Sequence, residues 1–292
     1  DVVVLGTGAA GLAAALAARQ AGADVILLER SDAIGGTTAI SGGTCWVPNH
    51  RVPHDGETDS RDDALAYLAS LSHDRIRPEM AAAFVDRGPD AVEWIERTTR
   101  LRFEVLKGFP DYHPEHPGGR ANGGRSLDPG LFPFPALGEW ADRVVRPAKD
   151  PHLTLPETSL GGGDGRIPRE VLAARRESDV RGCGAALVGG LLEALLDAGV
   201  EPRLEHRARR LVVSDGAVVG VEVDGPDGLL HVEARHGVVI ASGGFEWNQD
   251  LTSAYLRGPM TSPATYPSNT GDGLLMAQRA GARVDLMGEA WW

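Results

Sequence analysis

The sequence predicts an α/β fold: a Rossmann-like domain with a mainly parallel sheet, helices on its faces and a small antiparallel β appendage. Two observations support this prediction. The first thirty residues form a strand, a glycine-rich turn, a helix and a second strand, which is the βαβ unit of nucleotide-binding folds. Three apolar runs after residue 207 are joined by Asp-Gly pairs, which are typical of antiparallel hairpins.

A glycine-rich turn follows the first predicted strand. Residues 2–5 are all apolar, which suits a strand buried on both faces, and residues 11–21 form an Ala- and Leu-rich helix. Between them, Gly6 permits a tight turn, Gly8 lets the backbone approach a pyrophosphate, and Gly11 lets the helix pack close to the strand. We therefore expect the helix N-terminus to face phosphates.

An acidic residue ends the second predicted strand. Residues 24–28 form this strand and Glu29 stands at its carboxyl end, where a carboxylate accepts hydrogen bonds from a ribose diol that a 2′-phosphate would disrupt. NAD and FAD both offer a ribose and a pyrophosphate. Glu29 therefore predicts a dinucleotide without deciding between these two.

Two glycine clusters after Glu29 favour FAD. They are Gly35-Gly36-Thr37-Thr38 and Ser41-Gly42-Gly43-Thr44. A flavin lies lengthwise in its site, so the backbone beside its pyrophosphate, ribityl chain and ring must come close, which favours glycines with small hydroxyl residues. The alternative interpretation of this segment is a flexible surface loop.

Two segments in the last quarter of the chain carry similar small-residue turns. Residues 237–240 form an apolar strand followed by Ala241-Ser242-Gly243-Gly244, and Asn269-Thr270-Gly271-Asp272-Gly273 opens a helix that runs to about residue 280. The first-turn amides of this helix and Asp272 are suited to the phosphate or ribityl end of the cofactor. An ordinary capped helix start is the alternative.

These motifs together resemble a known flavoprotein superfamily. GTGAAG with Glu29, GGTTAISGG, VVIASGGFEWN and NTGDG, in this order, are similar to the FAD-dependent oxidoreductase 2 superfamily of fumarate reductase and 3-ketosteroid dehydrogenase flavoproteins. The resemblance runs from residue 1 to about residue 273. The segment FPDYHPEHPGG around Tyr112, followed by GRS at residues 124–126, resembles the 3-ketosteroid Δ1-dehydrogenase branch. Ser242 stands where the family often has Thr, and it keeps a small hydroxyl.

The resemblance implies FAD as the cofactor and Tyr112 as the catalytic residue of this chain. It also implies that backbone near Ala208 meets the adenine. The predicted cofactor-binding residues are Gly6, Gly8, Ala9, Ala10, Gly11, Glu29, Arg30, Gly35, Gly36, Thr37, Thr38, Ser41, Gly42, Gly43, Ala208, Ser242, Gly243, Gly244, Gly271 and Asp272.

The implied reaction is 1,2-dehydrogenation of a 3-ketosteroid-like ketone, with hydride transfer to flavin N5. A tyrosine, with a pKa near ~10 in water, assists removal of the α-hydrogen only where neighbours stabilise its anion. The expected partners are a small apolar, steroid-like ketone and an external electron acceptor.

Two other functions stay open. One is a fumarate-reductase-like reductase of an unsaturated acid, with Arg120 or Arg125 holding the carboxylate bidentately, although we expect both arginines to be solvated loop charges. The other is a cofactor-binding fragment that is inactive without its missing half.

Composition excludes several classes of protein. The chain has 292 residues, 42% of them hydrophobic, and a net charge of -12, so it can bury a sizeable core and is not expected to bind nucleic acid or an anionic membrane surface. No apolar run approaches the ~20 residues of a membrane span and no signal peptide precedes the first strand, so we expect a cytoplasmic enzyme. Glycine makes up 38 residues, which is about twice the usual share.

The histidines and cysteines predict no further chemistry. His113 and His116 flank Glu115, but a proline-rich loop is not expected to hold both imidazoles on one face, so no metal site is predicted. Cys45 and Cys183 lack metal-type or CxxC spacing, and we expect both to be small, buried or semi-buried residues without a redox role.

The predicted domains are an FAD-binding domain over residues 1–273, with a loop-rich insertion at about 105–168, and the start of a truncated substrate or capping domain over residues 274–292. The chain begins inside a strand without Met and stops at Trp292. We therefore expect an amino-terminal fragment whose remaining active-site groups lie beyond Trp292.

The rest of the chain divides by hydrophobic spacing and by its glycines and prolines. Its predicted helices cover residues 61–71, 78–100 and 183–198, the last of them amphipathic. Its predicted strands cover residues 208–214, 218–224 and 229–234, and residues 108–135 and 149–168 are predicted to be irregular.

Overall fold

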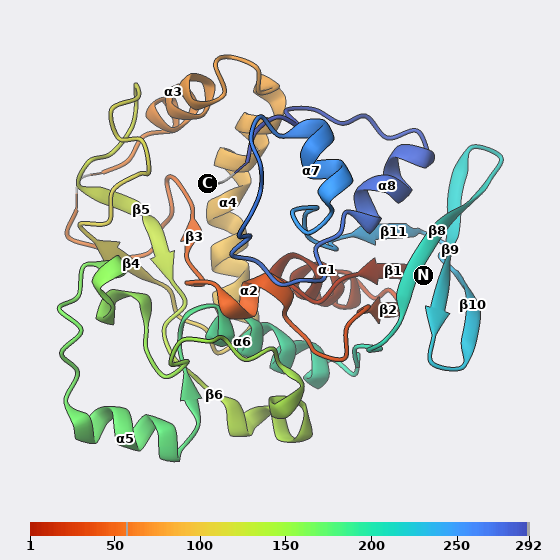
Figure 1. Cartoon of the computed structure of the whole chain (residues 1–292). Coiled ribbons are helices and arrows are strands. Elements are labelled where there is room, and N and C mark those ends of the chain that lie inside the picture. Colours follow the sequence, from red (N-terminus) through yellow and green to blue (C-terminus); the bar gives the residue numbers. More distant parts are fainter. Residues whose placement is uncertain (57, 291–292) are drawn as a thin grey trace. The chain divides into compact units, whose positions relative to one another are not determined.

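A computed structural model describes residues 1–56 and 58–290 (Figure 1). The chain divides into two compact units. The first comprises Asp1–Ile40, Ala136–Pro147 and Leu191–Trp292, and the second comprises Ser41–Pro135 and Ala148–Gly190.

A parallel sheet forms the centre of the first unit. Its strand order is β11 (Gly237–Ile240), β1 (Val2–Leu5) and β2 (Val25–Leu28), with Val2 paired to Gly237 on one side and to Val25 on the other. Helix α1 (Ala9–Gln20) connects β1 to β2 and packs against both strands. Since β1 lies between two strands, Val3, Val4 and Leu5 are almost completely buried, while Val2 at its start is partly exposed. This confirms the predicted βαβ unit.

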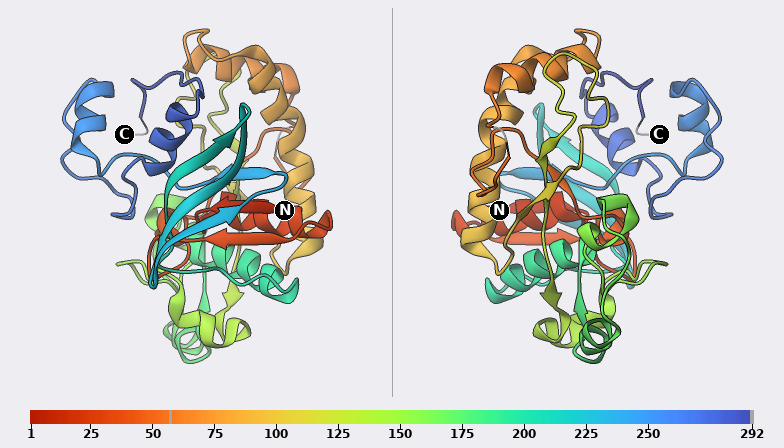
Figure 2. Two further views of the ribbon diagram at one scale, coloured as in Figure 1. Left: turned by 90° about the vertical axis from the view of Figure 1, so that its right-hand side faces the viewer. Right: turned by 90° about the vertical axis from the view of Figure 1, so that its left-hand side faces the viewer.

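An antiparallel sheet packs onto this centre. Strands β8 (Arg207–Ser214), β9 (Ala217–Gly225) and β10 (Gly228–Glu233) form a meander, which Figure 2 shows as a twisted ribbon. The turn between β8 and β9 has positive φ at Asp215 and Gly216, as a two-residue hairpin turn requires. Apolar residues of β8 and β9 share one buried cluster with β1 and β2, so the predicted antiparallel appendage is confirmed.

The second unit contains a helical pair and a small antiparallel sheet. Helices α3 (Arg61–Leu71) and α4 (Pro78–Thr98) pack together, and β3 (Cys45–Trp46) and β4 (Glu104–Lys107) pair with the two sides of β5 (Gly123–Asp128). The prediction that residues 108–135 are irregular is therefore wrong at β5. That strand has few β-branched or aromatic residues, and it forms because distant segments pair with it.

Local sequence features determine where helices α3 and α4 begin. The Ser60 side chain accepts a hydrogen bond from the Asp63 amide at 3.0 Å and caps α3, while Pro78 occupies the first turn of α4, where its missing N–H has no cost. Val85 and Val92 of α4 are buried as the spacing predicts. Phe84 of the same helix is 46% exposed.

The remaining elements are short, apart from α6, and complete the two units. Helix α6 is buried along most of its length, so the prediction that it is amphipathic is wrong. None of the described helices is long and apolar enough to cross a membrane. These elements are α2 (Gly36–Ile40), β6 (Phe132–Pro133), η1 (Phe134–Arg143), η2 (Leu155–Glu157), η3 (Ser159–Gly161), α5 (Arg169–Glu177), β7 (Val180–Arg181), α6 (Cys183–Asp197), α7 (Gln249–Tyr255) and α8 (Asp272–Arg279).

Candidate functional site

The turn between β1 and α1 is built on three glycines. Gly6 has φ +103°, and a Cβ there would lie 2.4 Å from the Ala241 carbonyl oxygen. A Cβ at Gly11 would lie 1.8 Å from the Gly6 carbonyl oxygen, so Gly11 allows close packing within the turn. Gly8 is the N-cap of α1 and provides no side-chain cap. Gly8 thus contributes no side chain to the first amides of the helix, which have no intrahelical acceptor.

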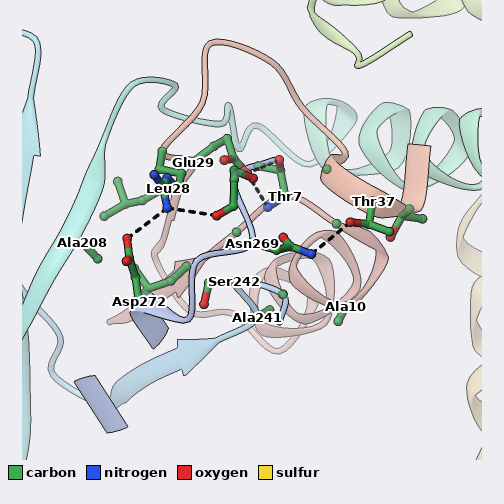
Figure 3. Close-up of a pocket in the computed structure, with 18 of the residues that line it drawn as sticks. Thr7, Ala10, Leu28, Glu29, Thr37, Ala208, Ala241, Ser242, Asn269 and Asp272 are labelled. Atoms are coloured by element: carbon green, nitrogen blue, oxygen red, sulfur yellow. Dashed lines mark hydrogen bonds and ion pairs between the residues drawn. The ribbon is translucent and has the colours of Figure 1, made fainter. Parts of the chain in front are cut away.

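This turn opens onto a cavity of about 280 Å³ within the first unit (Figure 3). Its wall combines the carboxyl ends of β1, β2 and β11 with the first turns of α1, α2 and α8. Such convergence at the carboxyl ends of parallel strands is where nucleotide sites of open α/β sheets lie. The lining residues are Leu5, Gly6, Thr7, Gly8, Ala9, Ala10, Leu28, Glu29, Arg30, Gly36, Thr37, Thr38, His206, Arg207, Ala208, Ala241, Ser242, Gly243, Ser268, Asn269 and Asp272.

Glu29 is held rigidly at the edge of this cavity. One carboxylate oxygen accepts hydrogen bonds from the Thr7 amide at 3.0 Å and the Thr7 hydroxyl at 2.6 Å, and the other accepts from the Ser31 amide at 3.0 Å. Figure 3 shows Glu29 pointing at Thr7. A carboxylate offers about four lone-pair sites, so Glu29 orders the glycine turn and keeps capacity for a further donor.

An ion cluster lines the same cavity. The Arg207 guanidinium donates to both oxygens of Asp272 at 2.7 and 3.0 Å, and Arg30 donates to the same carboxylate at 3.2 Å. Burial acts to raise the pKa of Asp272, but the hydrogen bonds and charges of Arg207 and Arg30 outweigh it and lower that pKa. Asp272 is therefore ionised and fixes two guanidinium groups beside the cavity.

Threonines of α2 connect the cavity wall to the segment before α8. The Thr38 hydroxyl accepts from the Ala9 amide at 3.1 Å. The Thr37 hydroxyl accepts from Asn269 Nδ2 at 3.1 Å (Figure 3). It also accepts from the Tyr266 amide at 3.1 Å. Residues 36–38 of the first predicted cluster thus belong to a short helix packed into the site, in contrast to the alternative of a flexible loop.

The structure brings thirteen of the twenty predicted cofactor residues to one cavity wall. Among the others, Gly11 packs beneath the turn, the Gly35 amide donates to the Thr7 hydroxyl at 3.1 Å, and the Gly271 amide donates to the Gly244 carbonyl at 3.0 Å. These residues do not line the cavity, but their contacts stabilise the segments that do.

The other three predicted residues, 41–43, belong to the second unit. The Gly43 amide donates to the Ser41 hydroxyl at 3.0 Å, and a Cβ at Gly43 would lie 2.5 Å from the Cys183 carbonyl carbon. Their contact with the cofactor stays a prediction.

The sequence reasoning missed eight of the lining residues, and the side chains of three of these form hydrogen bonds described above. Thr7 is the variable residue inside GTG, and Asn269 begins the NTGDG motif, so both lay inside recognised motifs. Arg207 had no motif of its own and is adjacent to the predicted Ala208. Its role depends on a long-range pairing with Asp272 that no local pattern indicates.

The loop that carries Tyr112 is anchored in the second unit on both sides of that residue. Asp111 is 3% exposed, and its carboxylate accepts from Trp46 Nε1 at 2.7 Å and from the Arg120 amide at 3.0 Å. The His113 amide donates to the Tyr67 hydroxyl at 3.3 Å. Tyr112 lies between these fixed points and is 62% exposed.

Arg125 is the centre of this anchor. Its guanidinium binds Asp59 through two hydrogen bonds of 2.9 and 2.8 Å and Asp111 through one of 2.8 Å, and it lies over the rings of Trp46 and Tyr67. Burial opposes the ionisation of Arg125 and Asp59, but their mutual hydrogen bonds and charges outweigh it, raising the pKa of Arg125 and lowering that of Asp59.

The expectation that Arg120 and Arg125 are solvated loop charges is therefore wrong. The side chain of Arg125 is 1% exposed and that of Arg120 is 12% exposed. Arg120 Nε donates to the Gly123 carbonyl at 3.2 Å and its Nη1 to the Thr58 carbonyl at 3.2 Å. Both guanidinium groups stabilise this part of the second unit, because two carboxylates bind Arg125 and two backbone carbonyls accept from Arg120.

The cysteines are partly buried, as predicted. Burial, with a further contribution from the charge of Asp128, raises the pKa of the Cys45 thiol to about 11 and that of Cys183 to about 12. Since the thiolate is the reactive form, neither side chain is suited to redox or nucleophilic chemistry at neutral pH.

Comparison with known proteins gives concordant matches. The chain matches the family described as FAD binding domain over residues 1–292. It is 39% identical over 300 residues to 4-oxocyclohexanecarboxylate 2-dehydrogenase of Sinomonas cyclohexanicum, which covers 100% of this chain and 51% of that protein. It is 36% identical over 322 residues to 3-oxosteroid 1-dehydrogenase of Mycobacterium tuberculosis, which covers 100% of this chain and 56% of that protein.

A solved structure has the same fold. The 3-ketosteroid Δ1-dehydrogenase from Sterolibacterium denitrificans, in complex with 1,4-androstadiene-3,17-dione, matches with a TM-score of 0.86 at 32% identity, covering 100% of this chain and 56% of that chain. The chain thus spans about half the length of the relatives it matches. These matches confirm the resemblance inferred from the motifs and FAD as the cofactor.

Proposed function

This chain belongs to the FAD binding domain family, and from this premise we propose that the protein catalyses the 1,2-dehydrogenation of a 3-ketosteroid-like cyclic ketone. The proposal concerns the whole protein, since the chain covers 51% and 56% of two similar dehydrogenases. Bound FAD supplies hydride acceptance at flavin N5. The residues of this chain bind the cofactor and contribute one group that assists removal of the α-hydrogen.

The cavity of the first unit has the donors and acceptors that one end of FAD requires. The N-terminus of α1, which Gly8 leaves without a side-chain cap, suits the pyrophosphate. Glu29, with remaining acceptor capacity, suits the hydroxyls of the adenosine ribose. Arg30 and Arg207 add positive charge near the phosphates. Each is paired with Asp272, so neither guanidinium is buried without a counterion.

The observation that carries the proposed reaction is an exposed tyrosine between two fixed neighbours. Asp111 is held by Arg125 and Trp46, and the His113 amide is held by Tyr67. Tyr112 is 62% exposed, so its side chain lies at the surface while its backbone is restrained on both sides. Such restraint is what a group that assists proton removal needs.

The alternative of an unsaturated-acid reductase loses its support in this chain. That function required Arg120 or Arg125 to bind a substrate carboxylate. Arg125 is saturated by Asp59 and Asp111 and is 1% exposed, while Arg120 donates to two backbone carbonyls. Arg125 therefore binds carboxylates of its own unit, and Arg120 uses its Nε and Nη1 donors within that unit.

The test is flavin reduction in the full-length protein under anaerobic conditions, with a 3-ketosteroid and with 4-oxocyclohexanecarboxylate as separate donors. We expect Tyr112→Phe to keep its FAD content and melting temperature, because the ring and its packing remain. Flavin reduction by the preferred ketone should slow by ~10² to 10⁴-fold, the usual contribution of general acid–base assistance.

Tyr255→Phe is the matched control. Tyr255 is a partly buried tyrosine of the first unit whose hydroxyl accepts a hydrogen bond from Gln278 Nε2 at 3.3 Å, and its loss should leave flavin reduction unchanged. The proposal is overturned if Tyr112→Phe reduces flavin at the rate of the wild type, or if the wild-type flavin responds to neither ketone.

A further inference from the structure

Three potential metal ligands meet on the loop that follows Tyr112. One ligand atom from each of His113, Glu115 and His116 lies within 4.8 Å of the other two. The two imidazole rings are 5.9 Å apart between centroids, and His113 Nδ1 lies 3.1 Å from a Glu115 carboxylate oxygen. The expectation that a proline-rich loop keeps these imidazoles apart is therefore wrong, because the turns around Pro114 and Pro117 fold the segment back on itself.

Helix α3 holds both histidines from one face. Tyr67 and Ser70 are three residues apart and so lie on the same side of the helix. The Tyr67 hydroxyl accepts from the His113 amide at 3.3 Å, and the Ser70 hydroxyl is hydrogen-bonded to His116 Nδ1 at 2.7 Å. Two independent contacts from one rigid element thus orient the two imidazole-bearing residues.

The loop also touches the backbone of α3 beyond the histidines. Gly118 has φ +75°, and a Cβ there would lie 2.0 Å from the Asp63 carbonyl oxygen. Only a glycine permits this approach, which fixes where the loop turns back after His116. The cluster therefore lies on a segment attached to α3 at three points.

We propose that His113, Glu115 and His116 form a binding site for a divalent transition-metal ion of the Zn²⁺, Co²⁺ or Ni²⁺ type. Two imidazoles and one carboxylate are a known ligand set for zinc, with one position left for water. In the tautomer whose Nδ1–H donates to Ser70, His116 keeps its Nε2 lone pair for the metal, and Ser70 is the outer partner that such histidines usually have.

The ligand types in the cluster determine which class of metal ion it binds. Imidazole ligands favour borderline transition metals, whereas Ca²⁺ and Mg²⁺ require mostly oxygen ligands. The side chains of His113 and Glu115 are 61% and 67% exposed, so they can rotate to reduce the separation of the ligand atoms to the ~2 Å metal bonds of such sites. The bound ion would link both ends of the His113–His116 segment, directly after Tyr112.

The test measures metal binding by the full-length protein with FAD bound, so it does not depend on turnover. Titration with Co²⁺, followed by its visible absorption, and competition of Zn²⁺ against a chromophoric chelator should give one site of micromolar affinity. The double variant His113→Ala/His116→Ala should abolish this site while FAD content stays normal. Ser70→Ala should weaken it by ~10 to 100-fold, as loss of an outer-shell partner does.

His231→Ala is the matched control. His231 is a 67% exposed histidine with a single glutamate, Glu222, at 3.7 Å, so it has the same chemistry without the second imidazole, and its loss should leave the affinity unchanged. The proposal is overturned if the wild type binds Zn²⁺ only at millimolar concentration, or if the double variant binds as tightly as the wild type.

Discussion

The guanidinium of Arg125 binds the carboxylate of Asp111 at 2.8 Å, and each of these side chains is 1% exposed. Asp111 immediately precedes Tyr112, so this buried ion pair determines where the tyrosine loop begins. The same guanidinium binds Asp59, just before α3. One arginine thus connects β5, the start of α3 and the loop.

Removing that arginine should strongly destabilise the second unit. Arg125→Ala leaves Asp59 and Asp111 buried without their cation, and breaking a buried ion pair in this way costs about 3–5 kcal/mol. We expect a large fall in the urea midpoint of the full-length protein. Arg51→Ala is the control: Arg51 pairs with Asp90 and Glu93, but its side chain is 56% exposed, so its loss should change the midpoint little. Similar midpoints for the two variants would contradict the structural role of Arg125.

The βαβ unit could be predicted from sequence because its signals are local. Residues 2–5 are continuously apolar, the glycines follow at fixed spacing, and Glu29 closes the second strand. Each of these features has one physical cause within thirty residues. The same holds for α3, which begins at the predicted residue 61 and is capped by the side chain of the preceding Ser60.

Other features could not be predicted because they depend on contacts between distant segments. Strand β5 contains Gly, Arg and Ser, which favour no strand by themselves, and it forms only through pairing with β3 and β4. Arg125 is buried because two aspartates 66 and 14 residues away reach it. At the cavity, Arg207 faces Asp272 across 65 residues, so sequence patterns identified the acid without its partner.

Glu29 should contribute to FAD affinity and to the order of the glycine turn. Glu29→Ala removes an acceptor that binds Thr7 and Ser31 and is placed for a ribose, so FAD binding should weaken by ~1.5 to 3 kcal/mol, as for hydrogen bonds to charged groups. Flavin fluorescence titration of the apoprotein measures this change. Asp32→Ala removes an exposed acid three residues away and should bind FAD normally; unchanged affinity in the Glu29 variant would remove Glu29 from the site.

Gly8 and Gly11 should respond differently to the same added methyl group. Gly8 has φ -66° and ψ 177°, which alanine adopts readily, and its Cβ would approach only the Thr38 hydroxyl closely, at 3.3 Å. Gly8→Ala should therefore keep the fold and lose FAD. At Gly11 the Cβ would lie 1.8 Å from a backbone oxygen, so Gly11→Ala should lose both. Circular dichroism with a flavin titration separates these outcomes, and equal behaviour of the two variants would contradict a phosphate-facing Gly8.

Asp128 should make the stability of the second unit depend on pH. Burial, with smaller contributions from Glu104 and Glu157, raises its pKa from 3.8 to about 6 against the opposing hydrogen bonds from the Gly130 and Leu155 amides. Because the folded-state pKa is the higher one, the contribution of Asp128 to stability is fully present below about pH 4 and is lost as the pH rises through about 6, a loss of about 3 kcal/mol.

Asp128→Asn tests this dependence, since it keeps an acceptor for the 2.8 Å hydrogen bond from Gly130 but cannot ionise. The free energy of unfolding of the variant, measured with urea, should increase relative to that of the wild type as the pH rises from 4 to 7. This gain should approach the loss of about 3 kcal/mol in the wild type. Loss of the second acceptor oxygen, 3.3 Å from the Leu155 amide, should lower the stability of the variant by a similar amount at every pH. Asp142→Asn, at a side chain that is 84% exposed, should run parallel to the wild type over the same range. Parallel curves for Asp128→Asn as well would mean that Asp128 is ionised in the folded protein without cost, and would contradict the burial of its carboxylate.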